Sequence, residues 1–225
     1  MLDTLLNTRL DTLHTTHSAF ARGHDRAGIF GDERRALLVV ADGAGGQTGA
    51  ARAASLVVDA VRDLAATRSE PLGVRGLIAL LERLDRAVLS ERDAGQTTAV
   101  VAEVVEDRFW GASVGDSGAW LVHERHHLDL TRAQHRKWRV GSGFARPIGF
   151  GPLPLVGTLM LASDGVLECA PPDRLLRAFS PRDSLGAVAG NLARAVRLPD
   201  GGLRDDVAVA LCRLGAAAAR THAAA

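Results

Sequence analysis

Aspartates stand at the ends of apolar runs in this sequence, and carboxylates in such positions can hold a metal ion. Asp42 and Asp164 directly follow runs that have strand character. Asp205 precedes a third such run, and Asp25 follows a fourth. Carboxylates gathered at one edge of a sheet would repel one another and raise each other's pKa unless a cation neutralised them, and their hard oxygen atoms select Mg²⁺ or Mn²⁺. Together the four aspartates indicate a metal site, although each one alone could be a simple turn residue.

The loop after Asp42 suits the close approach of a ligand. It joins a strand-like run to a segment of helical spacing, and four of the seven residues 43–49 are glycine. Glycine lets the backbone come close to a bound group. The loop also resembles a dinucleotide-binding loop, but the following strands do not alternate with helices and Asp42 would face a pyrophosphate. A cation is therefore the better candidate.

The elements that must position these residues follow from the periodicity of apolar residues. Steps of three and four residues predict helices over residues 48–66 and around residues 77–88. Three strand-like runs come next, and breaks as short as those between them join antiparallel neighbours. Grouped antiparallel strands with paired helices favour an α+β sandwich over a doubly wound parallel sheet. The three runs are residues 97–105, 108–114 and 119–123.

Weaker patterns complete the expected element order. Residues 1–17 are predicted to be a leader and residues 215–225 an alanine-rich tail, so that one domain spans residues 18–214. A cap at Ser180 followed by Pro181 predicts the start of a late helix. The remaining expectations are strands at residues 17–22, 36–41, 155–163 and 207–213, a turn at residues 28–35 and an irregular exposed stretch at residues 124–153.

Composition argues against several classes of protein. The 225 residues carry a net charge of +1, which provides no field for steering toward nucleic acid or an anionic membrane. With 47% hydrophobic residues, the chain can bury a large core. It carries no long apolar run and no signal peptide, and Cys169 and Cys212 read as buried free thiols. We therefore expect a monomeric, cytoplasmic protein that binds neither nucleic acid nor membranes.

Five short motifs follow one another along the chain, and three of them contain Asp42, Asp164 and Asp205. They are Asp42-Gly43-Ala44-Gly45-Gly46, Gly95-Gln96-Thr97-Thr98-Ala99-Val100, Val114-Gly115-Asp116-Ser117, Ala162-Ser163-Asp164-Gly165 and Asp205-Asp206-Val207-Ala208-Val209. In this order they resemble the successive motifs of the type 2C metal-dependent (PPM family) Ser/Thr protein phosphatases of bacteria. The resemblance spans residues 18–213 and implies a four-layer αββα sandwich. In that fold two packed antiparallel sheets are flanked by pairs of helices, with a binuclear metal centre in a cleft.

The resemblance also implies how two metal ions, Mn²⁺ or Mg²⁺, would be held. Asp42 would bridge the two ions, and the carbonyl oxygen of Gly43 would bind one of them. Asp164 and Asp205 would hold the other. Because two adjacent cations lower the pKa of a bridging water, Asp42 and Asp164 would act in catalysis through that water. Asp206 is the alternative metal ligand to Asp205, since only one of two adjacent residues can face the site from a strand.

Two further aspartates match positions of the family pattern. Asp25 matches the aspartate that ends the first motif of the family, and we expect it at the metal site. Asp116 matches an aspartate that helps to bind a third, weak metal ion in some members. The resemblance therefore implies two metal ions, with a third site as an open question.

The sequence departs from the family pattern near the substrate. The family usually has a phosphate-binding arginine where this chain has Phe20. Arg22 would point to the same face of a strand and is predicted to bind the substrate phosphate, with a solvated surface arginine as an equal alternative. His24 replaces an amide or carboxylate. Ala44 replaces a histidine that acts as a general acid in some relatives, which would lower the rate rather than weaken metal binding.

The expected function is hydrolysis of phosphoserine or phosphothreonine in a phosphoprotein, in opposition to a Ser/Thr kinase. The alternative is a phosphatase-like binding or regulatory module whose catalysis has decayed. Retention of every metal carboxylate favours the enzyme, because a pure binding module has no need for a costly cluster of like charges. A basic stretch stands where relatives carry a flap and could attract phosphopeptides, or could be only a solvated loop. Its cationic residues are Arg132, Arg136, Lys137, Arg139 and Arg146.

Overall fold

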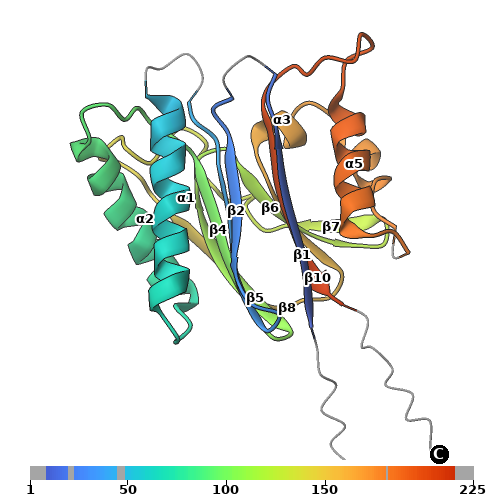
Figure 1. Cartoon of the computed structure of the whole chain (residues 1–225), viewed down its shortest axis with the longest axis horizontal. Helices are drawn as coiled ribbons and strands as arrows, with labels where there is room; N and C mark the ends of the chain where they lie inside the picture. The colour runs from blue at the N-terminus through green and yellow to red at the C-terminus, as the bar shows by residue number, and fades with distance from the viewer. Residues whose placement is uncertain (1–8, 20–22, 45–48, 181, 216–225) are drawn as a thin grey trace, which may run out of the picture.

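Two antiparallel sheets of five strands each form the centre of the structure, a computed structural model that describes residues 9–19, 23–44, 49–180 and 182–215 (Figure 1). All neighbouring strands within each sheet pair in the antiparallel sense. The sheet named here the β1 sheet has the order β1 (Leu10–His17), β10 (Val207–Leu214), β9 (Thr158–Ala162), β6 (Gly118–His123) and β7 (His126–Asp129). The β3 sheet has the order β2 (Arg26–Gly31), β3 (Arg35–Ala41), β4 (Ala99–Val105), β5 (Arg108–Val114) and β8 (Ile148–Pro154).

Helices cover the outer face of each sheet, and the two inner faces pack against each other. The long helices α1 (Ala50–Thr67) and α2 (Gly73–Ser90) lie on the β3 sheet, on the left in Figure 1. On the β1 sheet lie α5 (Leu185–Val196) and two short helices, α3 (Asp164–Leu167) and α4 (Pro172–Leu176). The predicted four-layer αββα sandwich is confirmed. Every helix in the described part of the chain is too short or too polar to span a lipid bilayer.

Strand β3 is apolar from Ala36 to Ala41 because it is covered on both faces. Side chains alternate between the faces of a strand. Leu37 and Val39 pack under α1 and α2, whereas Leu38 and Val40 belong to the core between the two sheets. All four are almost completely buried. The strand therefore forms a rigid central support that ends at Asp42.

The first strand lies where a leader was expected. Residues 10–17 form β1, which pairs with β10 from Leu10 opposite Leu214 to His17 opposite Val207. A leader that extends to residue 17 does not agree with this pairing. Of the strand expected at residues 17–22, His17 is the last residue of β1, Ser18 and Ala19 belong to no strand, and residues 20–22 lie outside the described residues. As an edge strand β1 has a weak apolar signal, but its three threonines favour extended backbone. Residues 216–225 of the expected tail lie outside the described residues.

Two other local predictions were wrong in part. A turn was expected at residues 28–35, but strand β2 continues to Gly31 and only the residues around Asp32 form the turn. The stretch of residues 124–153, expected to be irregular, contains β7 and most of β8. Both strands carry weak local signals, since β7 has only four residues and β8 contains glycine and proline.

The helices and the remaining strands lie close to their predicted positions. The helix expected after Ser180 is α5, but its cap is Ser184, whose Oγ accepts the backbone N–H of Ala187 at 3.2 Å. Of the strand expected at residues 155–163, only Thr158–Ala162 form a strand, β9. The strands expected at 36–41, 97–105, 108–114, 119–123 and 207–213 correspond to β3, β4, β5, β6 and β10.

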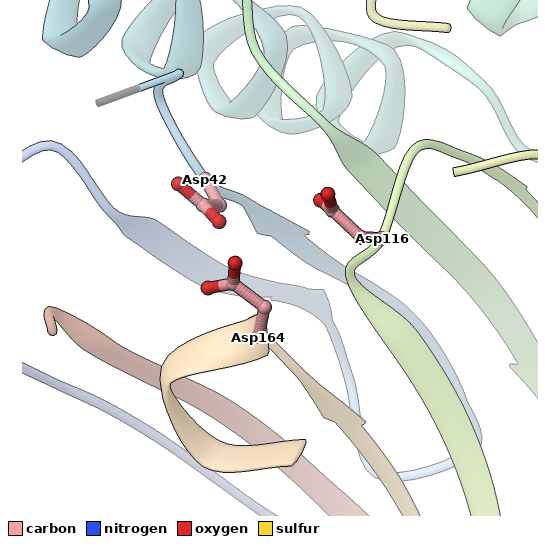
Figure 2. A group of neighbouring side chains, drawn as sticks. All are labelled: Asp42, Asp116 and Asp164. Atoms are coloured by element: carbon pink, nitrogen blue, oxygen red, sulfur yellow. The ribbon is translucent and has the colours of Figure 1, made fainter. Parts of the chain in front are cut away.

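The short connection between β5 and β6 crosses from one sheet to the other. Short breaks were expected to join antiparallel neighbours, which holds for β4 and β5 but is wrong for β5 and β6. The backbone of Gly115 adopts φ +96°, a conformation that glycine allows without strain. The crossing carries Asp116 to the edge of the sandwich, near the end of β3 (Figure 2).

Glu103 is a completely buried carboxylate on β4 that ties the β3 sheet to the connection between α1 and α2. One oxygen lies 2.7 Å from Nη2 of Arg35. The other accepts from Nε1 of Trp110 at 2.9 Å and from the backbone N–H of Leu72 at 2.8 Å. Arg35 also donates to the backbone carbonyls of residues 68–70. This network holds the start of α2 against the sheet.

We expect Glu103→Ala to lower the free energy of unfolding by about 3–5 kcal/mol, because it removes the carboxylate that pairs with the partly buried Arg35 and leaves the N–H of Leu72 and Nε1–H of Trp110 without an acceptor. Urea denaturation followed by circular dichroism would measure the loss. Glu106→Ala is the matched control, since the ion pair of Glu106 with Arg34 is exposed at both ends and should contribute less than about 1 kcal/mol. Equal losses in the two variants would contradict this interpretation.

Candidate functional site

Asp42 is the first residue after β3, and its backbone is held on both sides. Its N–H donates to Oγ1 of Thr98 at 3.1 Å, and its carbonyl oxygen accepts from the N–H of Thr98 at 2.8 Å and from Oγ1 of Thr97 at 2.8 Å. Oγ1 of Thr98 lies 2.6 Å from Oγ of Ser117, next to Asp116. The buried hydroxyl groups of two sequence motifs therefore position the aspartate of a third.

Three of the predicted ligands come together from segments far apart in the chain. Asp42 follows β3, Asp116 lies in the crossing between the sheets, and Asp164 is the first residue of α3. Figure 2 shows their carboxylates pointing toward one another. One carboxylate oxygen from each lies within 4.8 Å of the others. Such a group of oxygen atoms suits a metal ion.

A cavity of about 80 Å³ extends beside these carboxylates and is mainly polar. It has room for ions and a few waters, but not for an organic cofactor. The predicted residues Asp25, Gly43 and Asp205 line it. The full lining is His24, Asp25, Asp42, Gly43, Ala44, Arg139, Asp164, Asp205 and Asp206.

Glycines follow both central aspartates because neighbouring backbone passes very close. A Cβ added at Gly165 would lie 1.8 Å from the carbonyl oxygen of Asp206. A Cβ added at Gly43 would lie 2.7 Å from the backbone of Ala50 at the start of α1. Neither distance is possible for a real side chain, so the two Asp-Gly sequences allow the elements that carry the carboxylates to converge.

Burial and mutual repulsion disfavour the charged forms of the clustered carboxylates. Burial raises the pKa of Asp42 to about 10, and the neighbouring charges of Asp25 and Asp164 add to the effect. Burial also raises the pKa of Asp25 to about 7 and is the main cause of the raised pKa of Asp164. A bound cation would reverse these shifts by stabilising the ionised forms.

Two buried oxygen atoms in the site lack hydrogen-bond partners within the described residues. One is Oδ2 of Asp25, a residue only 6% exposed, and the other is Oδ1 of Asp116. Buried polar atoms are normally satisfied, so such atoms in a carboxylate cavity call for a cation. Since the acidic group consists of oxygen donors alone, the residues fit Mg²⁺ or Mn²⁺.

The neighbours Asp205 and Asp206 both border the cavity, which corrects the expectation that only one could do so. That expectation assumed a strand, but both residues precede β10, which begins at Val207. Asp206 is buried, and its carboxylate accepts the backbone N–H groups of Ala19 at 2.8 Å and His24 at 2.5 Å. Asp206 therefore fixes the segment before β2, and the exposed Asp205 remains the residue predicted to bind metal.

Of the positions where the sequence departs from the family pattern near the substrate, two line the cavity and two lie outside the described residues. Arg22 and Phe20 lie outside the described residues, so the role of Arg22 stays a prediction. His24 lines the cavity. Ala44 also lines it and is buried, with its N–H donating to the carbonyl oxygen of Gln96 at 2.9 Å. The position that is histidine in some relatives thus faces the site but has no proton to donate.

Sequence reasoning did not single out Arg139, which reaches the cavity from the basic stretch. Its Nη2 lies 3.5 Å from Oδ2 of Asp116. The sequence reasoning also gave no role to the hydroxyl groups of Thr98 and Ser117, although both residues belong to the motifs that carried the family resemblance. Those motifs were the only available signal for the hydroxyl groups, whereas nothing local distinguished Arg139 from the basic residues around it.

A comparison with protein-family models gives a match to the family described as stage II sporulation protein E (SpoIIE), over residues 32–215. The chain belongs to this family. The match covers more than half of the chain and includes Asp42, Asp116, Asp164 and Asp205. With the solved structures described next, it confirms the predicted resemblance to bacterial type 2C phosphatases.

Solved structures of bacterial phosphatases have the same fold as this SpoIIE-family chain. Ser/Thr phosphatase Stp1 from Staphylococcus aureus matches with a TM-score of 0.76 at 19% identity, over 92% of this chain and 95% of that one. The Streptococcus (S. agalactiae) Ser/Thr phosphatase matches with a TM-score of 0.77 at 19% identity, over 92% and 100%. The catalytic domain of the phosphatase PstP, in complex with two manganese ions, gives 0.73 at 19% identity, over 92% and 99%. No curated protein matches the sequence.

We expect the metal-free protein to lose stability as the pH rises. The pKa of Asp25, about 7, and that of Asp42, about 10, lie above the unfolded value of 3.8. Between pH 4 and 7 the unfolded chain therefore releases protons that the folded chain retains, which favours unfolding, and the contribution of Asp42 continues toward pH 10. Asp42→Asn should remove its part and raise the metal-free stability at pH 7.5 by roughly 1–3 kcal/mol.

Thermal denaturation in a chelator, from pH 4 to 9, would measure this effect as the difference in Tm between the parent and Asp42→Asn. The difference should grow with pH. Adding Mn²⁺ should raise the Tm of the parent and have much less effect on the variant. Asp107→Asn, in the exposed turn between β4 and β5, is the control. A difference in Tm that does not change with pH would exclude the proposed repulsion.

Proposed function

We propose that this SpoIIE-family protein is a metal-dependent phosphatase that hydrolyses phosphoserine or phosphothreonine in proteins. One observation carries the proposal: carboxylates from three separate segments lie within 4.8 Å of one another beside a small polar cavity. A cluster of partly buried like charges is costly without a cation, so the fold retains it at an energetic disadvantage unless metal binds.

The chain itself offers the ligands for two Mn²⁺ or Mg²⁺ ions. Asp42 and the carbonyl of Gly43 would hold one ion, and Asp42, Asp164 and Asp205 the other, with Asp25 beside them. When bound, such a pair of ions supplies an activated water and neutralises charge on the phosphoryl group. Asp116 is the candidate for a third ion, in competition with Arg139.

The remaining groups of the site decide how the leaving group, the Ser or Thr oxygen, is protonated. Because the methyl group of Ala44 has no acidic proton to donate, the departing Ser or Thr oxygen would receive its proton from water or from another group at the cavity. We therefore expect a modest rate of hydrolysis. Oδ2 of Asp25 lies in the site without a hydrogen-bond partner from the described residues, and it can accept a proton or a water. The backbone of His24 is held by Asp206, which keeps this edge of the cavity in place.

A second groove supports a protein rather than a small molecule as the substrate. Its volume is about 250 Å³, and its lining includes Asp116, whose carboxylate belongs to the group with Asp42 and Asp164. Arg132, Arg136 and His127 line it, with Arg136 ion-paired to Glu168. A chain segment on either side of a phosphorylated residue could lie there. The proposed partner is therefore a phosphoprotein whose phosphate a Ser/Thr kinase supplied.

Hydrolysis of phosphoserine and phosphothreonine peptides, with and without Mn²⁺, tests the enzyme. We expect turnover that depends on metal, and a fall in kcat of at least about 100-fold in Asp42→Asn and in Asp164→Asn. Asp107→Asn should be unchanged, since this residue is exposed and lies in the turn between β4 and β5. Manganese binding without any turnover by the parent would favour the alternative, a binding or regulatory module.

The predicted role of Arg22 has its own test. If Arg22 binds the substrate phosphate, Arg22→Ala should raise KM by about tenfold and change kcat less, because the contact is made in the ground state as well as in the transition state. Steady-state kinetics with a phosphopeptide would measure both constants. Unchanged kinetics would remove Arg22 from the site.

A further inference from the structure

Arg139 supplies the positive charge of the carboxylate cavity. Among the lining residues that the structure describes, it is the only one that is charged positively at every working pH. The cavity lining otherwise contains five aspartates. A phosphate group that enters would meet strong repulsion from these carboxylates, so its binding depends on whatever cations face it, whether metal ions or this guanidinium.

The guanidinium of Arg139 has donors to spare. Its contact with Asp116 is long, 3.5 Å from Nη2 to Oδ2, and its Nε is buried without a partner among the described residues. A guanidinium has five N–H donors in a fixed plane that matches two oxygen atoms of a phosphate. The arginine is therefore held near Asp116 by one weak ion pair, with other donors unused at the cavity.

The backbone around Arg139 is fixed to the same frame as Asp42. The next residue, Val140, pairs with Thr97 through two hydrogen bonds of 3.0 and 2.8 Å. Thr97 in turn bonds to the carbonyl oxygen of Asp42. The guanidinium and the central metal ligand are thus positioned by one short segment between them.

A buried carboxylate on α2 holds the loop that follows. Asp85 is 5% exposed and accepts three backbone N–H groups, from Gly141 at 2.8 Å, Gly143 at 3.0 Å and Ala145 at 3.1 Å. An aspartate that accepts several N–H groups shapes a loop much as a helix cap does. This loop is consequently no simple solvated flap, since its first part is built against α2 and the site.

We propose that Arg139 binds the phosphoryl group of the substrate, with Asp116 orienting its guanidinium. The inference rests on the proposed function, because it assigns a substrate contact to the same cavity. Two parallel N–H donors to phosphate oxygens would add a charge-assisted, directional contact to the attraction of the metal ions. The residue thereby favours an anionic ligand over a neutral one.

Titration calorimetry with inorganic phosphate on the full chain in Mn²⁺ tests this role without turnover. We expect Arg139→Ala to weaken phosphate binding at least about tenfold, with Mn²⁺ affinity equal or higher because a competing cation has gone from Asp116. Arg139→Lys keeps the charge but not the planar fork and should lie between the two. Arg83→Ala, on the exposed face of α2, removes the same charge elsewhere and should match the parent.

Each outcome decides the point. Unchanged phosphate affinity in Arg139→Ala would overturn the assignment. So would a loss of Mn²⁺ affinity in the same variant, since the arginine would then act only by ordering the carboxylates. Peptide hydrolysis by the parent is measured separately: a parent that binds phosphate through Arg139 but does not hydrolyse peptides would retain this inference and lose the proposed function. If the parent hydrolyses peptides and Arg139→Ala has no effect on phosphate binding, the proposed function is retained and this inference is lost.

Discussion

Repulsion between carboxylates that are buried or partly buried is the physical constraint on which this structure depends. Asp25, Asp42 and Asp164 are brought together where burial already disfavours their charged forms, as their raised pKa values record. Such an arrangement persists only if each carboxylate is carried by a segment that cannot relax away. A divalent cation converts the same arrangement from unfavourable to favourable, which makes the cluster a site rather than a defect.

The rigidity that resists this repulsion comes from apolar packing. Strand β3 is buried on both faces, by the helices above it and by the β1 sheet below it, and Asp42 is the residue at which this apolar support ends. The hydroxyls of Thr97, Thr98 and Ser117 then fix the backbone and the neighbouring motif. The polar site thus begins where the well-packed strand β3 ends, and packing of the core around β3 fixes the position of Asp42.

Much of this could be predicted from local patterns. The strand at residues 36–41, the long helices and the Asp-Gly steps at Asp42 and Asp164 each have signals within a few residues of themselves. The αββα fold followed from five short motifs in order. Strand β1 was misread because an edge strand needs little apolar surface, and the connection through Asp116 was misread because its length alone does not tell whether the chain stays in one sheet.

The sequence by itself determined the kind of chemistry: oxygen ligands at strand ends, no thiolate set, and a family pattern with the arginine and histidine positions altered. Only the tertiary structure decided which side chains meet. It placed Asp116 beside Asp42 and Asp164 and brought Arg139 into the cavity. It also hydrogen-bonded the carboxylate of Asp206 to the backbone N–H groups of Ala19 and His24, which are distant in the sequence. The physical reason is that residue type and local periodicity are properties of neighbours in the chain, whereas repulsion, burial and hydrogen bonding depend on distances that packing between the sheets and helices sets.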